Sequence, residues 1–369
     1  MKNIRTLVQQ YAADLPLKQA STPPSAWYMD AGVATLEKDA VFGSTWQMVA
    51  RLDQLQEKGA YVTADVAGEP IVVVKSDAIR AFYNVCRHHG AKVMNGQTGC
   101  QKTLTCPYHG WTYSLDGELI HNTFFDEVEG FDKSQNGLKP VRVETWENWV
   151  FVNLNPNAPD LKTSFGSFYD RFVSLKLGLL HFWTRREYRL ESNWKVFVDN
   201  YLDGGYHIPF IHRGLSSVLD NPEYVIEAVD SHCLQACPMA EANTETAKVR
   251  EGKTAWYVWQ YPNFIINAYE GDDGVKIMDT NLVLPDGPEG CLVICDYWYL
   301  DVSDSAKDYN DEGVRIADEI QTEDMGICAS VQRGLNSRSY DTGRLSAQKE
   351  AGEYLFHQLL YKDLIRKLD

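Results

Sequence analysis

The chain has 369 residues, of which 44% are hydrophobic and 23% charged, as is ordinary for a globular protein long enough to hold two domains with separate cores. Its formal net charge of −16 argues against nucleic acid and against anionic membrane surfaces as partners, because both would repel it. No apolar stretch of about 20 residues is present to span a bilayer.

The N-terminal sequence lacks the apolar core of a secretory signal, since Met1–Arg5 leads into a mixed polar segment. The eight cysteines fit a reducing compartment better than a disulfide framework. We therefore expect a cytoplasmic protein whose thiols are reduced, apart from any that bind metal.

The first two thirds of the chain are expected to contain an arm, a small all-β domain and the start of a larger domain. Three prolines interrupt any long helix in residues 1–40, which predicts an N-terminal arm. Residues 41–155 contain short runs of β-forming residues separated by turn-forming ones. The expected elements are strands at 61–63 and 71–74 around a turn at 68–70, a hairpin at Asp116–Gly117, and strands near 141–143 and 149–152.

Two Cys/His pairs lie within this β-rich region, Cys86-x-His88 and Cys106-x-x-His109. Two thiolates can hold one iron and two neutral imidazoles the other iron of a Rieske-type [2Fe–2S] cluster, whose imidazoles raise its reduction potential. A zinc site is the alternative, since the same ligand types suit zinc, although zinc ribbons favour C-x-x-C pairs. His89 is expected to be a supporting or surface group.

The last part of the chain, 156–369, changes in character after a polar, turn-forming linker at 155–160. Its hydrophobic pattern predicts an antiparallel sheet wrapped by helices. The expected elements are helix at 194–211, strands within 255–268 and 276–300, and helix from 311 to the end.

A second metal centre is indicated by His207 and His212. Two imidazoles and a distant carboxylate can form a facial triad on Fe(II) that leaves positions open for dioxygen. Asp203 lies four residues before His207, so on a regular helix it could orient that imidazole. The alternative is a pair of structural helix histidines.

These motifs resemble those of Rieske non-haem iron oxygenases, with plant-type choline monooxygenases the nearest group. The resemblance rests on the C-x-H and C-x-x-H pairs and on the stretches 22–28, 193–203 and 330–335, and it covers nearly the whole chain. It implies an α+β fold, in which a small all-β Rieske [2Fe–2S] domain is followed by a helix-grip catalytic domain, an antiparallel sheet with helices.

The resemblance also implies cofactors, partners and further site residues. It implies a mononuclear Fe(II), O2 as cosubstrate, and NAD(P)H electrons delivered by a separate ferredoxin or flavin reductase to a homotrimer. The family places an acidic iron ligand late in the chain, for which Asp324 is the candidate and Glu323 the alternative. Asn200 resembles an asparagine near the iron, although it could equally be a plain polar helix residue.

Asp203 departs from the family pattern. An acidic residue three positions before the first iron histidine usually bridges it to a cluster histidine of the adjacent subunit, but Gly204 stands there. Adjacent glycines at 204 and 205 disfavour a regular helix, and local bending could give Asp203 the same reach. Asp203 is thus the predicted bridge.

The activity that the resemblance implies is hydroxylation or N-demethylation of a small quaternary ammonium compound such as choline by a monooxygenase or dioxygenase. Aromatic faces can bind such a cation, and the later strands offer many. The alternatives are an aromatic-ring hydroxylase or a demethylase of an aromatic acid, which use the same irons, and a ferredoxin-like carrier that uses only the cluster. An arginine in the pocket would favour a carboxylate, and aromatic walls with a lone carboxylate would favour a cation. The aromatic candidates are Trp256, Tyr257, Trp259, Tyr261, Phe264, Tyr269, Tyr297, Trp298 and Tyr299.

Overall fold

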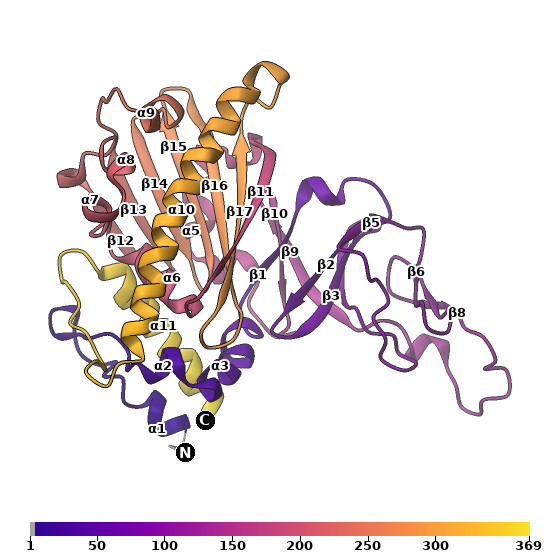
Figure 1. Cartoon of the computed structure of the whole chain (residues 1–369). Helices are drawn as coiled ribbons and strands as arrows, with labels where there is room; N and C mark the ends of the chain where they lie inside the picture. The colour runs from indigo at the N-terminus through magenta and orange to yellow at the C-terminus, as the bar shows by residue number, and fades with distance from the viewer. Residues whose placement is uncertain (1–3) are drawn as a thin grey trace. The chain divides into compact units, whose positions relative to one another are not determined.

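The computed structural model describes residues 4–369, which divide into two compact units. The first, which we call the β unit, comprises 42–164, and the second, the helix–sheet unit, comprises 165–369 together with the described residues up to Val41. The N-terminal residues therefore belong to the helix–sheet unit, where α1 and α3 contact α11 (Figure 1). The expected α+β class, a β-rich domain before a mixed sheet and helix domain, is confirmed.

The β unit is built on a seven-stranded sheet in the order β1-β10-β9-β4-β3-β2-β5 and a three-stranded sheet in the order β6-β7-β8. Neighbouring strands are antiparallel, and their inward residues form two apolar clusters. The strands are β1 Gln47–Arg51, β2 Ala60–Val66, β3 Glu69–Lys75, β4 Ile79–Tyr83, β5 Thr98–Cys100, β6 Leu104–Thr105, β7 Thr112–Tyr113, β8 Leu119–His121, β9 Pro140–Trp146 and β10 Trp149–Asn153.

Two turns of the β unit can be compared with their sequence signals. The first was expected at 68–70 but lies at Ala67 and Gly68, which have φ of 56° and 86°. Two successive residues with positive φ match the twist of a hairpin, so Pro70 falls inside β3, opposite Asp65. The hairpin at Asp116–Gly117 is confirmed, because the Gly117 amide donates to the Ser114 carbonyl.

The helix–sheet unit contains a seven-stranded antiparallel sheet in the order β11-β17-β16-β15-β14-β13-β12. Its central strands β14 to β17 are buried along most of their length, so their side chains form the core beneath the helices. The strands are β11 His181–Leu190, β12 Val225–Val229, β13 His232–Pro238, β14 Thr254–Gln260, β15 Phe264–Gly271, β16 Gly274–Pro285 and β17 Cys291–Tyr299.

Helix α10 lies across one face of this sheet, and α6 and α11 contact the sheet and each other (Figure 1). The helical region expected at 194–211 is broken, because Gly204 and Gly205 have φ of 70° and 68° and end α6. The helix expected from 311 onward is also interrupted, between α10 and α11. The helices are α1 Ile4–Val8, α2 Ala26–Met29, α3 Ala31–Glu37, α4 Leu161–Phe165, α5 Ser167–Arg171, α6 Trp194–Leu202, α7 Ile208–Ile211, α8 Arg213–Ser216, α9 Glu245–Val249, α10 Lys307–Leu335 and α11 Ala351–Leu368.

A buried ion pair joins the N-terminal helices to α6. Lys195 Nζ lies 2.6 Å from Glu37 Oε1, and both side chains are at most 2% exposed. The Trp194 indole donates to the other Glu37 oxygen at 3.0 Å. Each charge therefore depends on the other for compensation, since neither reaches water.

We expect Glu37→Ala to destabilise the helix–sheet unit by about 3–5 kcal/mol, because it leaves the Lys195 ammonium buried and unpaired. Urea unfolding followed by tryptophan fluorescence measures the loss. The double variant Glu37→Ala/Lys195→Met removes both charges and should recover much of it. Equal stability of the single variant and the parent would contradict the expectation.

Candidate functional site

The two Cys/His pairs lie on loops of the β unit with the same backbone pattern. The Cys86 amide donates to the Ala91 carbonyl at 2.8 Å, and the Gly90 amide donates to the Cys86 carbonyl at 3.0 Å. In the second loop, the Cys106 amide donates to the Trp111 carbonyl at 2.8 Å, and the Gly110 amide donates to the Cys106 carbonyl at 3.1 Å. Gly90 and Gly110 have φ of 76° and 71°, which only glycine adopts readily, so each loop can turn back after its histidine.

The two cysteines are buried and their side chains contact each other. Burial raises the pKa of the Cys106 thiol, so a positive ion is needed to hold it as a thiolate. Tyr113 supports the first loop, because its hydroxyl lies 3.3 Å from Cys86 Sγ and accepts from the Arg87 amide at 2.9 Å. Tyr113 thus helps to fix the position of the Cys86 thiol.

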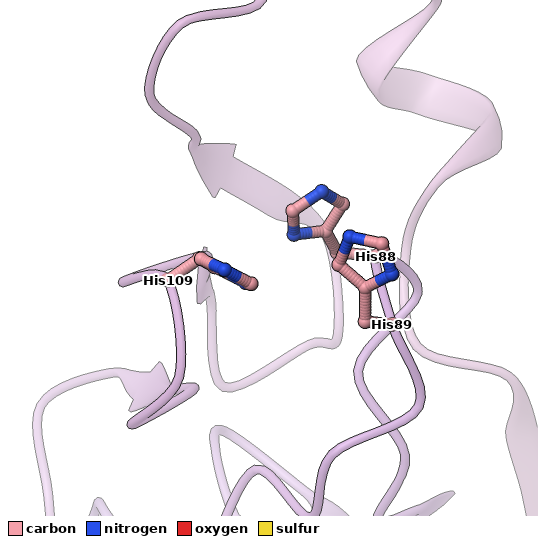
Figure 2. Close-up of side chains that lie close together, drawn as sticks. All are labelled: His88, His89 and His109. Atoms are coloured by element: carbon pink, nitrogen blue, oxygen red, sulfur yellow. The ribbon is translucent and has the colours of Figure 1, made fainter.

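Three imidazoles gather on these two loops, those of His88, His89 and His109 (Figure 2). One ring nitrogen from each of the three lies within 4.8 Å of the other two. No thiol among the described residues belongs to this group. A single zinc ion would need thiols and imidazoles around one point, whereas a two-iron cluster needs the thiols and the imidazoles as separate pairs. His88 Nδ1 is buried and has no hydrogen-bond partner within residues 4–369, as a metal-binding nitrogen would. His88 also stacks on Trp111 at 4.8 Å, which fixes its ring.

The second centre is built where α6, α7 and α10 meet. His207 immediately precedes α7, His212 follows it, and Asp324 lies on the buried face of α10. Asp324 Oδ1 is 3.1 Å from His212 Nε2 and 3.9 Å from His207 Nε2. One ligand atom of each residue lies within 4.8 Å of the others, so the three could hold one metal ion.

Each of these side chains is held by a further polar partner. His207 Nδ1 lies 2.8 Å from Asp203 Oδ2, His212 Nδ1 lies 2.7 Å from Glu323 Oε2, and Asn200 Nδ2 donates to Asp324 Oδ1 at 2.8 Å. A carboxylate on Nδ1 fixes the tautomer that leaves Nε2 free to bind a metal.

The double glycine after α6 positions Asp203. Its carboxylate accepts from the amides of Tyr206 and His207 at 3.1 and 2.9 Å, which closes the turn. A Cβ at Gly204 would lie 2.2 Å from the Lys349 carbonyl oxygen, and the positive φ adds strain. The position three residues before His207 therefore excludes a side chain, and the neighbouring Asp203 contacts the imidazole instead.

The field at this site favours a cation. Burial by itself lowers the pKa of His212, but the hydrogen bonds and charges of Asp324 and Glu323 outweigh it, so its pKa lies above the usual 6.5. A proton and a metal ion compete for binding at His212. Carboxylates beside two imidazoles form a ligand set that suits Fe(II).

A cavity with an empty volume of about 700 Å³ adjoins these three residues. Five tyrosines line it: Tyr201, Tyr224, Tyr257, Tyr269 and Tyr297. Of the aromatic residues singled out from the sequence, only Tyr257, Tyr269 and Tyr297 line this cavity among the described residues. Trp259 packs against Phe356, and Tyr261 donates to Asp363, so both have structural contacts elsewhere.

Two opposite charges lie in the walls of this cavity, Arg250 and Asp279, which are 8% and 9% exposed. The Arg250 guanidinium lies 4.8 Å from the centre of the Tyr269 ring and donates to its hydroxyl, but its Nε has no partner within residues 4–369. Asp279 accepts from Asn267 Nδ2 at 2.7 Å. Burial raises the pKa of Asp279 and Arg250 opposes that rise.

Two family models match the chain: the Rieske [2Fe–2S] domain at residues 45–132 and the ring hydroxylating alpha subunit, catalytic domain, at 178–364. Chloroplastic choline monooxygenase of Arabidopsis thaliana is 38% identical over 99% of this chain and 88% of that protein. The carnitine monooxygenase oxygenase subunit of Escherichia coli is 32% identical over 93% of this chain and 94% of that protein. The chain belongs to the Rieske non-haem iron oxygenases.

Solved structures agree with this assignment. A crystal structure of a quaternary ammonium Rieske monooxygenase in complex with L-carnitine covers 96% of the oxygenase and 98% of its own chain, with a TM-score of 0.82 and 29% identity. Naphthalene 1,2-dioxygenase of Rhodococcus, at 19% identity and a TM-score of 0.79, shares the fold. No helix in residues 4–369 of the oxygenase is long and apolar enough to cross a membrane.

The family carries a [2Fe–2S] cluster and a mononuclear iron, and both donor sets of the oxygenase fit them. We propose Cys86, His88, Cys106 and His109 as cluster ligands. For the iron we propose His207, His212 and Asp324, with Glu323 supporting His212 from outside.

Sequence reasoning missed Arg250 and Asp279, which belong to no motif. A signal for Asp279 was present, because Asp279 and Asn281 are polar residues inside a strongly apolar run. For Arg250, the sequence shows only a charged residue after a short helix.

We expect Asp324→Asn to abolish stable iron binding and Glu323→Gln to weaken it by about 10–100-fold, as loss of a supporting carboxylate does. Chelator competition, followed by iron analysis corrected for the cluster, measures both. Glu319→Gln, one turn earlier on α10 and paired only with exposed Arg315, is the matched control and should bind iron normally. A greater loss of iron binding in Glu323→Gln than in Asp324→Asn would indicate that Glu323 is the iron ligand and Asp324 the supporting residue.

Proposed function

We propose that the oxygenase uses O2 and reductase-supplied electrons to hydroxylate or N-demethylate a small quaternary ammonium compound. The observation that carries the proposal is a tyrosine-lined cavity, containing a buried carboxylate, beside the proposed iron ligands. Relatives named for choline and carnitine support it.

The cavity can bind a quaternary ammonium group without hydrogen bonds. Such a cation has no N–H to donate, so it is held by aromatic faces and by negative charge. The tyrosine rings supply the first and Asp279 the second. The Asn281 and Gln321 carbonyl oxygens have no partner within residues 4–369, so they remain available to substrate or water.

Arg250 favours a substrate that also carries a carboxylate. A guanidinium binds a carboxylate in bidentate fashion, and the Arg250 Nε is unpartnered in the cavity wall. A betaine, which joins a quaternary ammonium group to a carboxylate, would match both Asp279 and Arg250. Arg250 also supports the second candidate, an aromatic acid, which would use the arginine but not Asp279.

The side chains around the proposed metal sites orient the metal ligands and do not themselves take part in the reaction. The cluster supplies single electrons and the mononuclear iron activates dioxygen when both are bound. Asp203 and Glu323 keep the two imidazoles in one tautomer, and Asn200 fixes the Asp324 oxygen that faces them. The predicted bridging role of Asp203 is supported by its 2.8 Å contact with His207.

The substrate is tested by oxygen uptake with product analysis, using a surrogate reductase and choline, carnitine, glycine betaine and benzoate. We expect coupled product from the quaternary ammonium compounds, with the betaines preferred over choline. Arg250→Gln should raise KM for the betaines by about 10–100-fold, the equivalent of losing a charge-assisted hydrogen bond of 1.5–3 kcal/mol, and should affect choline less.

Asp279→Asn provides the complementary variant, because it removes the negative charge but keeps a group of similar shape. It should weaken binding of choline and of the betaines alike. Turnover of benzoate alone, or no effect of Asp279→Asn on any quaternary ammonium substrate, would overturn the substrate assignment.

Members of this family receive electrons from a separate reductase, and we propose that it docks beside the cluster of a homotrimeric oxygenase. Arg87, Lys92 and Lys102 are exposed near the cluster loops, in a chain whose formal charge is −16. Basic residues in an otherwise acidic protein would steer an acidic partner.

Charge reversal at Lys92 and Lys102 is expected to slow cluster reduction by about 10-fold or more at low salt, with the difference shrinking as salt rises. Stopped-flow reduction by the reductase measures it. Charge reversal of Lys253 is the control, since this exposed lysine pairs with Asp272 in the helix–sheet unit. Equal rates at low salt would remove the proposed docking site.

A further inference from the structure

A second cavity in the helix–sheet unit adjoins a neighbouring face of α6 and has an empty volume of about 670 Å³. Three acidic residues line it, namely Asp199, Asp203 and Glu353. Asn200 lines both this cavity and the tyrosine-lined one. The proposed reaction gives this second cavity no role.

Two of these carboxylates, Asp199 and Glu353, meet the buried imidazole of His357 beside the cavity. Glu353 and His357 lie one turn apart on α11, so both project from the same face of the helix. Asp199 comes from α6, and its Oδ1 lies 2.9 Å from His357 Nε2. One ligand atom from each of these three residues lies within 4.8 Å of the other two.

Glu353 is the group that the fold leaves unsatisfied. Its side chain is 7% exposed, and within residues 4–369 it has neither a hydrogen bond nor an ion pair. A buried carboxylate without a partner is costly. A cation bound between Glu353, Asp199 and His357, whose ligand atoms lie within 4.8 Å of one another, would offset that cost.

The other two groups are held in place. Tyr28 donates to Asp199 Oδ2 at 2.6 Å, which leaves Oδ1 directed at His357. The His357 side chain is fully buried, so its ring has little freedom to turn. The arrangement thus resembles a set of metal ligands braced by a neighbouring hydroxyl.

We propose that Asp199, Glu353 and His357 form a second metal site, distinct from the iron site, which binds a divalent first-row ion such as Zn²⁺. Two carboxylate oxygens and an imidazole nitrogen are ligands that zinc accepts, and two ligands four residues apart on a helix are a common zinc-binding arrangement. The adjoining cavity leaves room for water to complete the coordination. The ion neutralises the carboxylates and links α6 to α11.

Zinc binding is best measured where the iron site is disabled. The starting protein is the oxygenase with its cluster intact, carrying His207→Ala and stripped of loosely bound metal by a chelator. We expect this parent to bind one zinc ion per chain in equilibrium dialysis with elemental analysis. Glu353→Gln in the same background should weaken binding by about 100-fold or more, since even loss of a supporting residue costs 10–100-fold.

Glu350→Gln is the matched control, because Glu350 precedes the same helix and is partly buried but is not a proposed ligand. It should bind zinc like the parent. Thermal unfolding provides a second measurement: zinc should raise the Tm of the parent and of Glu350→Gln, but not that of Glu353→Gln. Without zinc, Glu353→Gln should be at least as stable as the parent, because it replaces a buried carboxyl group that has no hydrogen bond or ion pair within residues 4–369.

Two results would overturn the proposal. One is a parent that binds no zinc at concentrations that load ordinary sites. The other is equal zinc binding by the parent and Glu353→Gln, which would place the ion elsewhere. Anomalous scattering at the zinc edge from crystals of the parent should show a peak between α6 and α11, and a peak at His212 and Asp324 alone would count against the site.

Discussion

The turn at Gly204 and Gly205 is the constraint on which the proposed iron site depends. It ends α6 and reverses the chain tightly enough for the Asp203 carboxylate to accept from the His207 amide and contact the His207 ring. The backbone of Lys349 packs where a side chain at Gly204 would be, so an acid cannot occupy that position. Backbone packing at Gly204 thus decides that Asp203 is the carboxylate that contacts His207, a proposed iron ligand.

Negative charge is the second organising feature of the helix–sheet unit. Burying a carboxylate costs free energy unless donors or a cation compensate it. Glu37 is compensated by Lys195, Asp279 lies in the field of Arg250, and Asp324 faces two imidazoles. Glu353 lacks any such compensation among the described residues, which is why the second cavity stands out. Most of these carboxylates lie near α6, so this short helix largely determines where polar side chains lie in both cavities.

The β unit holds the four proposed cluster ligands on two loops. It uses the same pair of backbone hydrogen bonds in each loop, with a left-handed glycine after each histidine. Tyr113 and Trp111 then brace the thiol and imidazole sides. The side chain of His109 is exposed, so one edge of the proposed cluster site reaches the surface.

The sequence by itself determined the features that depend on neighbouring residues: the paired cluster motifs, the hairpin at Asp116–Gly117, the two-part α+β organisation and the His207/His212 pair. It could not separate Asp324 from Glu323, because adjacent helix residues differ only in the face they present, and packing of α10 directs Asp324 to the Nε2 atoms and Glu323 to the outer nitrogen of His212. Nor could it reveal that Arg250 and Asp279 share a cavity, or that Asp199 meets Glu353 and His357. Those groups lie on elements far apart in the chain, so only the tertiary structure, through sheet order and helix packing, could decide which of them meet.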